Sequence, residues 1–499
     1  MIMDNFNLID SPWIPVRWHH TASGDTASLV SLHEAFDRGT GIADLDCAPH
    51  ERIAMTRLLV CITHAALGAP EDADEWGDFG KDFATEICAY LRKPEIYPHF
   101  NLLGDGPRFL QMKKGAAGTE AGYPLCKLFF QLSSGNSPKL LDHWGEDPRP
   151  WTPADAALGL LCLQNFFVGG SMASKVKGNG PGLKSLQMLL VGDTLTDTLL
   201  RNCIDLKTLE QTGNGLGKPV WESEPDHQLL ARLAPIPCAL CLSDDLSTTL
   251  IDQGYQYLEY GAYRDPFTTT LSLKQSKDGE RRLLRANLEK GIWHDLNLIT
   301  NLKHTDGISG PLNLQSFKAR SNPGEWTHLW VGELIKAVDA KIIDCTESTF
   351  TVPRSLFLES GSFTYAAGVE YADKVSKALY GAIKRYWSVL KHETAPVAEG
   401  QKHYWQQLDQ EHRILIQLAG DSDSLNDKPA MGKEDAKDPW SEQVRRSALN
   451  AFNRVCPRTT PRQYQAYANG IKPLFGTLYL KEKKGKRPSK QYKVTNQTE

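Results

Sequence analysis

Apolar residues recur at helical spacing through the last third of the chain, and residues three and four apart share one side of an α-helix. The apolar residues with this spacing are Val375, Leu379, Ala382, Ile383, Tyr386 and Leu390. Further helices are expected around 401–419, from Pro439 (after Asp438 as the cap) to Val455, and from 460 to 480. We therefore predict an all-α four-helix bundle over residues 356–499.

The preceding part of the chain mixes strand and helix patterns. Residues 13–18 predict a strand, and Ser31 with Glu34 forms a capping box for a short helix. A longer helix is predicted by the spacing of Arg52, Ile53, Met55, Leu58, Leu59, Ile62 and Ala66. Residues 236–242 and 248–251 flank a turn-forming Ser-Asp-Asp sequence and predict a hairpin. This mixture favours an α+β fold.

A strongly apolar helix leads into a glycine-rich segment. The helix is expected to begin at Pro153 and to stop at the glycine pair Gly169 and Gly170. Residues 169–182 then contain five glycines and two lysines without apolar periodicity. Residues 133–150, rich in Ser, Asn, Gly, Pro and charge, predict an extended or mobile loop.

Length and composition limit the class of protein. At 499 residues the chain exceeds what one hydrophobic core usually supports, so two or more domains are expected. No apolar run reaches the roughly 18 residues that a membrane helix needs. The first residues, with Asp4 and Asp10, lack a secretion signal pattern. The ten cysteines are scattered, which favours reduced thiols. We expect a cytoplasmic protein without a membrane partner.

Several short sequences, in order along most of the chain, carry a resemblance to a known family. They are residues 6–17 (FNLIDSPWIPVR), 30–36 (VSLHEAF), 58–62 (LLVCI), 101–103 (NLL), 108–111 (RFLQ), 133–143 (SSGNSPKLLDH), 164–170 (QNFFVGG), 263–266 (YRDP) and 404–408 (YWQQL). On these segments the chain resembles the large subunit of the type I-E CRISPR surveillance complex Cascade, the CasA family.

The resemblance implies a non-catalytic protein that works within an assembly. Its expected partners are the other Cascade subunits, the CRISPR guide RNA, double-stranded target DNA and a recruited nuclease-helicase. It is expected to recognise the protospacer-adjacent motif (PAM), a short duplex signal, and to promote R-loop formation. The net charge of −4 argues against indiscriminate phosphate binding, but a local basic patch suffices for a subunit that reads a short motif.

The glycine-rich segment is the first candidate for DNA contact. Glycine clusters commonly form plain solvent loops, but glycines also let a backbone approach nucleic acid while lysines meet phosphates. The resemblance implies that this loop faces the minor groove of the PAM, where recognition is permissive. The candidate residues here are Gly169, Gly170, Ser171, Lys175 and Lys177.

Two further elements of the family, a lysine finger and a glutamine wedge, have no direct counterpart here. No lysine occurs from 219 to 273, so Arg264, or second to it Arg232, would supply the positive charge of the finger. The wedge is expected near residues 334–341, which contain no glutamine. There Val338 can intercalate as an apolar side chain. The other candidate residues of this turn are Lys336, Asp339 and Lys341.

Metal and enzyme chemistry have weaker support. Cys238 and Cys241 suggest zinc, but a second ligand pair at suitable spacing is missing, and two ordinary cysteines on a strand are favoured. Asp142-His143 and His294-Asp295 lack the further ligands that a metal nuclease needs. Because GxxxxGK[ST], GxSxG and HExxH motifs are absent, we expect no catalytic residue, no metal and no cofactor.

The predicted organisation is an α+β DNA-motif-recognition domain over residues 1–355 and a four-helix bundle with a basic tail over residues 356–499. The tail, residues 481–493, is rich in Lys and Arg and serves either solubility or contact with nucleic-acid phosphates. The alternatives to motif recognition are a purely structural assembly subunit and a metal-dependent nuclease.

Overall fold

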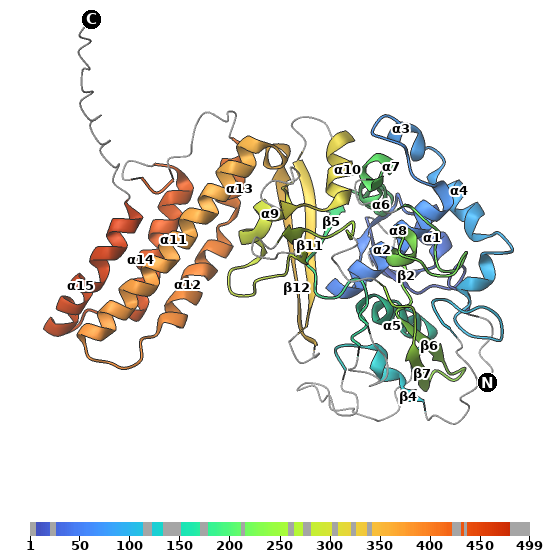
Figure 1. Cartoon of the computed structure of the whole chain (residues 1–499), viewed down its shortest axis with the longest axis horizontal. Coiled ribbons are helices and arrows are strands. Elements are labelled where there is room, and N and C mark those ends of the chain that lie inside the picture. Colours follow the sequence, from blue (N-terminus) through green and yellow to red (C-terminus); the bar gives the residue numbers. More distant parts are fainter. Residues whose placement is uncertain are drawn as a thin grey trace, which may run out of the picture. The chain divides into compact units, whose positions relative to one another are not determined.

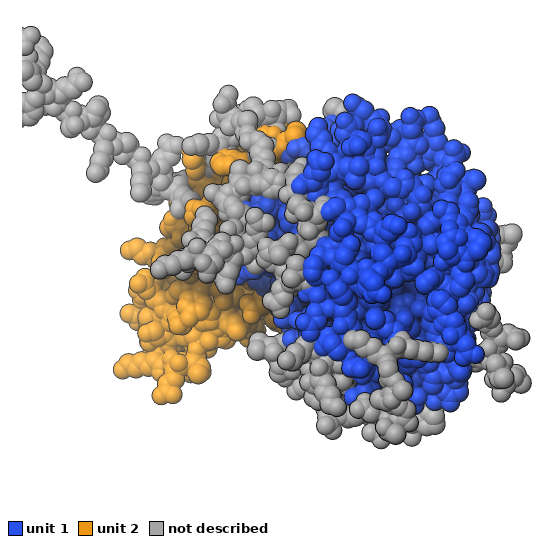
Figure 2. All heavy atoms as spheres, turned by 45° about the vertical axis from the view of Figure 1, so that its right-hand side comes forward, with its two compact units in different colours: residues 1–288, 295–357 blue, residues 289–294, 358–499 orange. Residues whose placement is uncertain are grey.

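The computed structural model forms two compact units. Unit 1 comprises residues 1–288 and 295–357, and unit 2 comprises residues 289–294 and 358–499 (Figure 2). The mixture of helices and small antiparallel sheets confirms the predicted α+β class (Figure 1). The residues that the structure describes are 6–19, 26–112, 122–132, 151–169, 178–210, 215–257, 264–272, 281–301, 308–320, 326–336, 342–421, 431–433 and 437–479.

Unit 1 begins with a three-stranded sheet in the order β2-β1-β3. Its strands are β1 (Ile14–Trp18), β2 (Ala27–Val30) and β3 (Ile42–Leu45). Trp13 is buried, and its indole Nε1 donates to the carbonyl oxygen of Leu8 at 3.1 Å. Ser31 and Glu34 form the predicted capping box of α1 (Leu32–Asp37). The strand and the short helix expected near the start of the chain are therefore confirmed.

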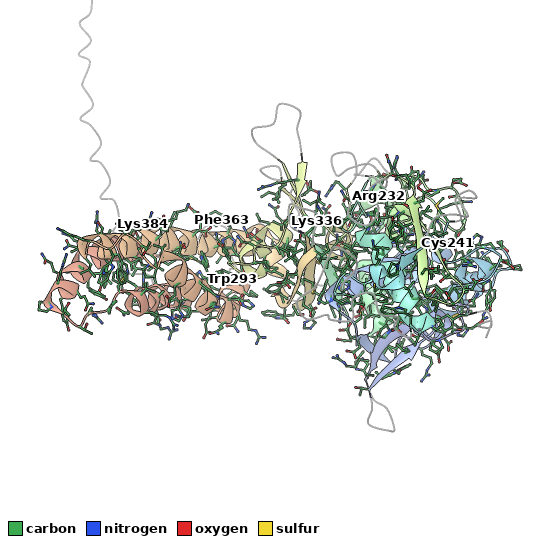
Figure 3. All side chains as sticks on the ribbon, turned by 90° about the horizontal axis from the view of Figure 1, so that it is seen from below. Arg232, Cys241, Trp293, Lys336, Phe363 and Lys384 are labelled. Atoms are coloured by element: carbon green, nitrogen blue, oxygen red, sulfur yellow. The ribbon has the colours of Figure 1, made fainter. Side chains whose placement is uncertain are left out.

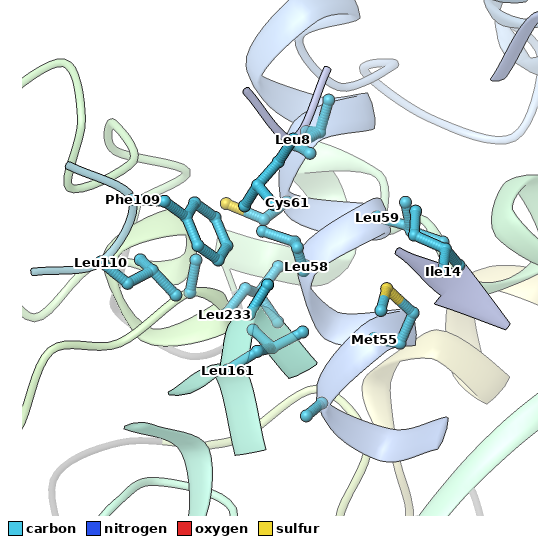
Figure 4. Packing of buried hydrophobic residues seen from close by; sticks show 14 of the residues in the cluster. Leu8, Ile14, Met55, Leu58, Leu59, Cys61, Phe109, Leu110, Leu161 and Leu233 are labelled. Carbon is cyan, nitrogen blue, oxygen red and sulfur yellow. The ribbon is translucent and has the colours of Figure 1, made fainter. Parts of the chain in front are cut away.

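The core of unit 1 lies around α2 (Pro49–Leu67), which is buried along most of its length. Figure 4 shows Leu58 and Cys61 of α2 on the side of Phe109, Leu161 and Leu233, and Leu59 beside Ile14. Two further core helices are α5 (Pro153–Phe166) and α8 (Leu229–Leu233). Helix α5 is apolar on nearly all sides, as expected of a helix surrounded by protein. It begins at Pro153, as the sequence predicts.

The other helices of unit 1 are short. They are α3 (Trp76–Phe79), α4 (Phe83–Leu91), α6 (Leu195–Asn202), α7 (Leu206–Glu210), α9 (Leu296–Ile299) and α10 (Leu312–Arg320). Single 3₁₀ turns of unit 1 occur at Tyr97–Phe100, Leu125–Leu128 and Arg354–Phe357, and another, Ile292–Asp295, crosses the division of the chain between the two units.

Three more sheets complete unit 1. The predicted hairpin is formed by β6 (Cys238–Leu242) and β7 (Thr248–Gln253), with β4 (Tyr123–Pro124) on the other side of β7. A second sheet has the order β10-β8-β9 and contains Ile308–Ser309, Thr270–Ser272 and Arg281–Leu283. The third has the order β12-β11-β5 and contains β5 (Gln187–Val191), β11 (Trp326–Lys336) and β12 (Ile342–Pro353). This third sheet positions the candidate site.

The described residues of unit 2 after Leu358 fold mainly into helices. Its helices are α11 (Glu359–Val389), α12 (Val397–Gln410), α13 (Arg413–Gly420), α14 (Pro439–Val455) and α15 (Pro461–Leu478). Asp438 caps α14 as predicted, accepting from the backbone N of Ser441 at 2.7 Å. None of the helices described in either unit is long and apolar enough to cross a membrane.

The expectation of a single helix over 401–419 is wrong, because the chain breaks between α12 and α13. At the break, Nδ1 of His412 lies 2.5 Å from the carbonyl oxygen of Asp409. In a continuous helix that carbonyl would accept from the backbone N of Arg413. The imidazole therefore competes for the acceptor at the point where the helix is interrupted.

Residues 289–294, which we call the strap, belong to unit 2 although they precede the helices by a long stretch of sequence. The Trp293 side chain is only 1% exposed, and its ring centroid lies 5.5 Å from that of Trp440 and 6.3 Å from that of Trp405. The Tyr365 hydroxyl donates to the Trp293 carbonyl oxygen at 2.8 Å. Trp293 is labelled in Figure 3. The strap thus supplies a central aromatic side chain to the core of unit 2.

Candidate nucleic-acid interface

The two ends of the glycine-rich segment meet in a narrow pairing that we call the neck, residues 165–169 and 178–182. Val168 and Asn179 form an antiparallel bridge. The backbone N of Gly180 donates to the Phe167 carbonyl at 2.8 Å, and that of Gly182 donates to the Asn165 carbonyl at 2.9 Å. The neck therefore fixes where the segment leaves and rejoins the body of unit 1.

Close backbone approach explains the glycines of the neck. A Cβ on Gly169 would lie 2.1 Å from the carbonyl oxygen of Gly178, and one on Gly180 would lie 2.3 Å from that of Asn165. Gly178 itself has a φ of +93°, in the region that favours glycine. Gly169 thus has a packing role. The other candidates of this segment, Gly170, Ser171, Lys175 and Lys177, lie outside the described residues.

The hairpin of β11 and β12 carries the second candidate region. Lys336 is the last residue of β11 and pairs with Ile342, after an irregularity in register beside Ile335. Lys336 is labelled in Figure 3. The remaining candidates of the turn, Val338, Asp339 and Lys341, lie outside the described residues.

A buried carboxylate anchors the hairpin to the segment that follows β9. Glu333 is 1% exposed, and its Oε1 lies 2.9 Å from Arg285 Nε while its Oε2 accepts from the Ala286 backbone N at 2.7 Å. Arg285 Nη2 also donates to the Lys336 carbonyl oxygen at 3.3 Å. Burial raises the pKa of Glu333, and the bonds from Ala286 and Arg285 oppose that shift. Arg285 and Ala286 therefore fix the last residues of β11, Glu333 to Lys336, by hydrogen bonds.

Arg264 is followed in the chain by Asp265, which forms a buried ion pair with Arg57. The Arg264 side chain is partly buried, and its Nη2 donates to the Gly310 carbonyl oxygen at 3.3 Å. The next residue, Asp265, pairs through Oδ2 with Arg57 Nη1 at 2.8 Å. Arg232, the second choice for a finger, is 1% exposed and cannot reach a phosphate in this structure.

One strand, β5, connects the three candidate regions. Leu183 to Leu186 join the neck to β5, and β5 pairs with β11 from His328 to Gly332. At the start of β5, Gln187 forms a bridge with Thr268, and the backbone N of Met188 donates to the Phe267 carbonyl at 2.8 Å. The neck, the loop after Arg264 and the hairpin therefore share one support, although the sequence separates them widely.

Sequence reasoning missed Arg57 and Glu333, which hold this arrangement together. Arg57 Nη1 also lies 3.4 Å from Gln187 Oε1, so the ion pair reaches β5 directly. The signal in the sequence was the charge itself. Arg57 interrupts an apolar stretch of a helix, and Glu333 interrupts an apolar stretch of a strand. A charge in such a stretch is expected to have a buried partner.

The structure gives Cys238 and Cys241 separate surroundings. They are three apart on β6, so the strand pleat directs them to opposite faces. Cys238 Sγ lies 3.3 Å from Gln164 Oε1, and Cys241 Sγ lies 3.9 Å from Arg108 Nη1. The two thiols cannot hold one ion in this geometry. Cys241 is labelled in Figure 3.

The histidine and aspartate pairs do not form a metal cluster within the described residues. His294 Nε2 lies 3.1 Å from Asp373 Oδ2 in unit 2, and Asp373 also pairs with Lys290 at 2.7 Å. A lysine in this position already compensates the carboxylate charge. Asp142 and His143 lie outside the described residues.

Comparison with known proteins places this architecture in a family context. The family model described as CRISPR-associated protein Cse1 matches residues 7–451. A curated relative from Thermus thermophilus, CRISPR-associated protein CasA/Cse1, is 25% identical over 529 aligned positions, which cover 95% of this chain and 97% of the relative.

Solved structures share the fold. CasA (Cse1) from Thermus thermophilus superposes with a TM-score of 0.74 at 22% identity, covering 95% of this chain and 99% of that one. Cse1 from Acidimicrobium ferrooxidans gives 0.73 at 19% identity, covering 95% and 98%. A chain of a CRISPR RNA-guided surveillance complex gives 0.74 at 18% identity, covering 94% and 99%.

Proposed function

The chain belongs to the CRISPR-associated protein Cse1 family, and from that premise we propose that it is the non-catalytic large subunit of a type I-E RNA-guided surveillance complex. In this role it recognises the PAM in double-stranded DNA, promotes opening of the adjacent base pairs and recruits the nuclease-helicase. The family match over most of the chain supports this proposal, as does the likeness in fold to a chain of a surveillance complex.

The proposal that the chain recognises DNA rests on one observation. Strand β5 supports the neck, the loop after Arg264 and the β11–β12 hairpin together. The neck encloses the segment that contains Gly170, Ser171, Lys175 and Lys177, and the β11–β12 hairpin encloses the turn that contains Val338, Asp339 and Lys341 next to Lys336. Two segments held by one strand can act on one short stretch of duplex. Lysines meet phosphates and fix the register, while the inserted turn separates bases.

The energetic role is nucleation of strand exchange. Motif contacts offset the cost of opening the first base pairs, after which pairing with the guide RNA carries sequence specificity. Removing a lysine of the glycine-rich segment is then expected to weaken binding to every duplex, because phosphate contacts carry no sequence information. Changing the turn is expected to alter which flanking triplets are accepted.

The test is binding of the reconstituted complex to duplexes with randomised flanking triplets. We compare the wild-type chain with Val338→Gly, with the pair Lys175→Ala and Lys177→Ala, and with Lys207→Ala, an exposed lysine on α7 as the matched control. The turn variant is expected to change the enriched triplets, and the lysine pair to reduce affinity and its salt dependence.

The control Lys207→Ala is expected to behave as wild type. If the complex assembles with each variant and the enriched triplets and affinities do not change, the chain serves assembly alone. Metal-dependent cleavage of duplex DNA by the purified chain would contradict the non-catalytic role.

A further inference from the structure

Strand β12 is an edge strand of unusual length in this chain. The sheet order β12-β11-β5 leaves one side of β12 without a neighbouring strand, and β12 pairs with β11 all along Trp326–Lys336. Strand β5 reaches only His328 to Gly332 of β11. Within the described parts of the chain, residues 343–349 make no backbone hydrogen bonds to any segment other than β11. Among the described residues no strand pairs with the outer backbone groups of this stretch, and the Cys345 N–H is met locally by Asp344 Oδ1 at 2.8 Å.

The same residues are exposed. Ile343 is 60% exposed, and Asp344, Cys345, Glu347 and Thr349 are also exposed. A long strand edge with free backbone groups is a template for an added strand. Proteins usually block such edges with lysine, proline or a bulge. Between Asp344 and Thr349 the sequence contains neither lysine nor proline, and the register irregularity of β12 lies at its start, at Ile343.

Charge around the edge selects the kind of partner. Partial burial raises the pKa of the Cys345 thiol, and Asp344, Glu347 and Glu51 raise it further, so three carboxylates act on this position. The nearby Arg52 is already engaged by Asp44, with Nη1 2.6 Å from Oδ1 and Nη2 2.9 Å from Oδ2. The edge therefore presents negative charge.

This charge argues against two occupants. Nucleic-acid phosphates would be repelled by the carboxylates. A second copy pairing edge to edge would bring like charges together, which destabilises cross-strand pairs. An extended peptide with Lys or Arg between β-forming residues can form hydrogen bonds with the backbone edge, and its positive charges can pair with the carboxylates.

We propose that β12 accepts an extended, lysine- or arginine-bearing segment of a partner protein as an added strand. Main-chain hydrogen bonds would supply affinity, and the carboxylates would supply the preference for a basic segment. This surface is distinct from the DNA contacts proposed above, since it uses the outer edge of the hairpin rather than its turn.

The probe is a fluorescein-labelled nonapeptide of alternating valine and lysine with blocked ends, titrated with the full chain by fluorescence anisotropy. Ile343→Lys and Asp344→Lys are expected to weaken its binding by at least about tenfold, because each adds a like charge to the edge. The matched control is Leu250→Lys on β7, where Leu250 is 47% exposed on another sheet. It is expected to bind as wild type does.

Alkylation of Cys345 by iodoacetamide, followed by peptide mass spectrometry, gives a local measurement on the unmutated chain. The basic peptide is expected to slow alkylation of Cys345, while a peptide with glutamate in place of lysine leaves its rate unchanged. The proposal fails if the basic peptide does not bind at about 1 mM or if Ile343→Lys binds it as wild type does. It also fails if duplex DNA, and not the basic peptide, protects Cys345 from alkylation.

Discussion

Arg57 Nη1 lies 2.8 Å from Asp265 Oδ2, and the two side chains are 0% and 1% exposed. Arg57 Nη2 also donates to the Arg232 carbonyl oxygen at 2.9 Å, and Asp265 Oδ1 accepts from the Phe267 backbone N at 3.1 Å. The pair thus joins α2, α8 and the loop that bridges to β5. Buried charges are tolerated when they are paired and hydrogen-bonded. Removing one partner leaves the other charge buried without compensation.

Arg57→Ala is therefore expected to lower the free energy of unfolding by about 3–5 kcal/mol, since it leaves the Asp265 carboxylate buried and alone. Thermal unfolding of the full chain measures the loss. The control is Arg17→Ala, whose side chain is 56% exposed in its pair with Asp46. That surface pair is expected to contribute less than about 1 kcal/mol. Equal losses in both variants would contradict the organising role of Arg57.

Gly169→Ala is expected to disturb the neck, because the new Cβ would meet the carbonyl oxygen of Gly178 at 2.1 Å. Overpacking of this kind costs about 1–3 kcal/mol, and it displaces the base of the glycine-rich segment. The measurements are thermal unfolding and duplex binding by the reconstituted complex. Gly106→Ala is the control, since a Cβ there meets nothing within 4 Å. If both variants melt and bind alike, the neck does not need a glycine at 169.

The sequence predicted much of the local structure because the signals were local. The cap at Asp438, the box of Ser31 with Glu34 and the start of α5 at Pro153 depend on residues within one helical turn. The break before α13 was not predicted, because apolar spacing continues across it. In the structure it is marked by the contact of His412 with the Asp409 carbonyl and by backbone bonds of three-residue spacing, from Glu411 to Leu408 and from Ile414 to Glu411.

The arrangement of the candidate site could not be predicted, because it depends on pairing between distant segments. The sequence predicts that Gly169 lets the backbone approach nucleic acid, whereas in the structure it is the backbone of Gly178 that lies close to Gly169. The link from the neck through β5 to β11 joins residues far apart in the chain. The periodicity of a strand predicts which side chains are buried, but it does not predict which other strand pairs with it. The strap posed the same difficulty, since Trp293 lies far in sequence from Trp405 and Trp440.

Trp293→Ala is expected to loosen unit 2, because it removes a fully buried ring from between two other tryptophans. Large aromatic truncations in cores cost about 3–5 kcal/mol. Hydrogen exchange followed by mass spectrometry should show faster exchange in α12 and α14, with unit 1 unchanged. Trp326→Ala, at a tryptophan 50% exposed on β11, is the control. Unaltered exchange in the helices would show that the strap only rests on unit 2.

Asp373 makes the anchoring of the strap dependent on pH. Burial alone would raise the pKa of Asp373, but the hydrogen bonds from His294 and Lys290 lower it to about 2 from 3.8. The folded state therefore binds fewer protons at this site than the unfolded state. Its contribution to stability is present above the unfolded pKa of 3.8 and is lost as the pH falls towards 2.

The difference in melting temperature between wild type and Asp373→Asn is accordingly expected to be largest above pH 4 and to shrink towards pH 2. The comparison cancels the other carboxylates, since they titrate in both proteins. The control variant is Asp421→Asn, at an exposed carboxylate that ends α13. A constant gap between wild type and Asp373→Asn over this range would mean that the Asp373 charge does not hold the strap, because only a charge is lost on protonation.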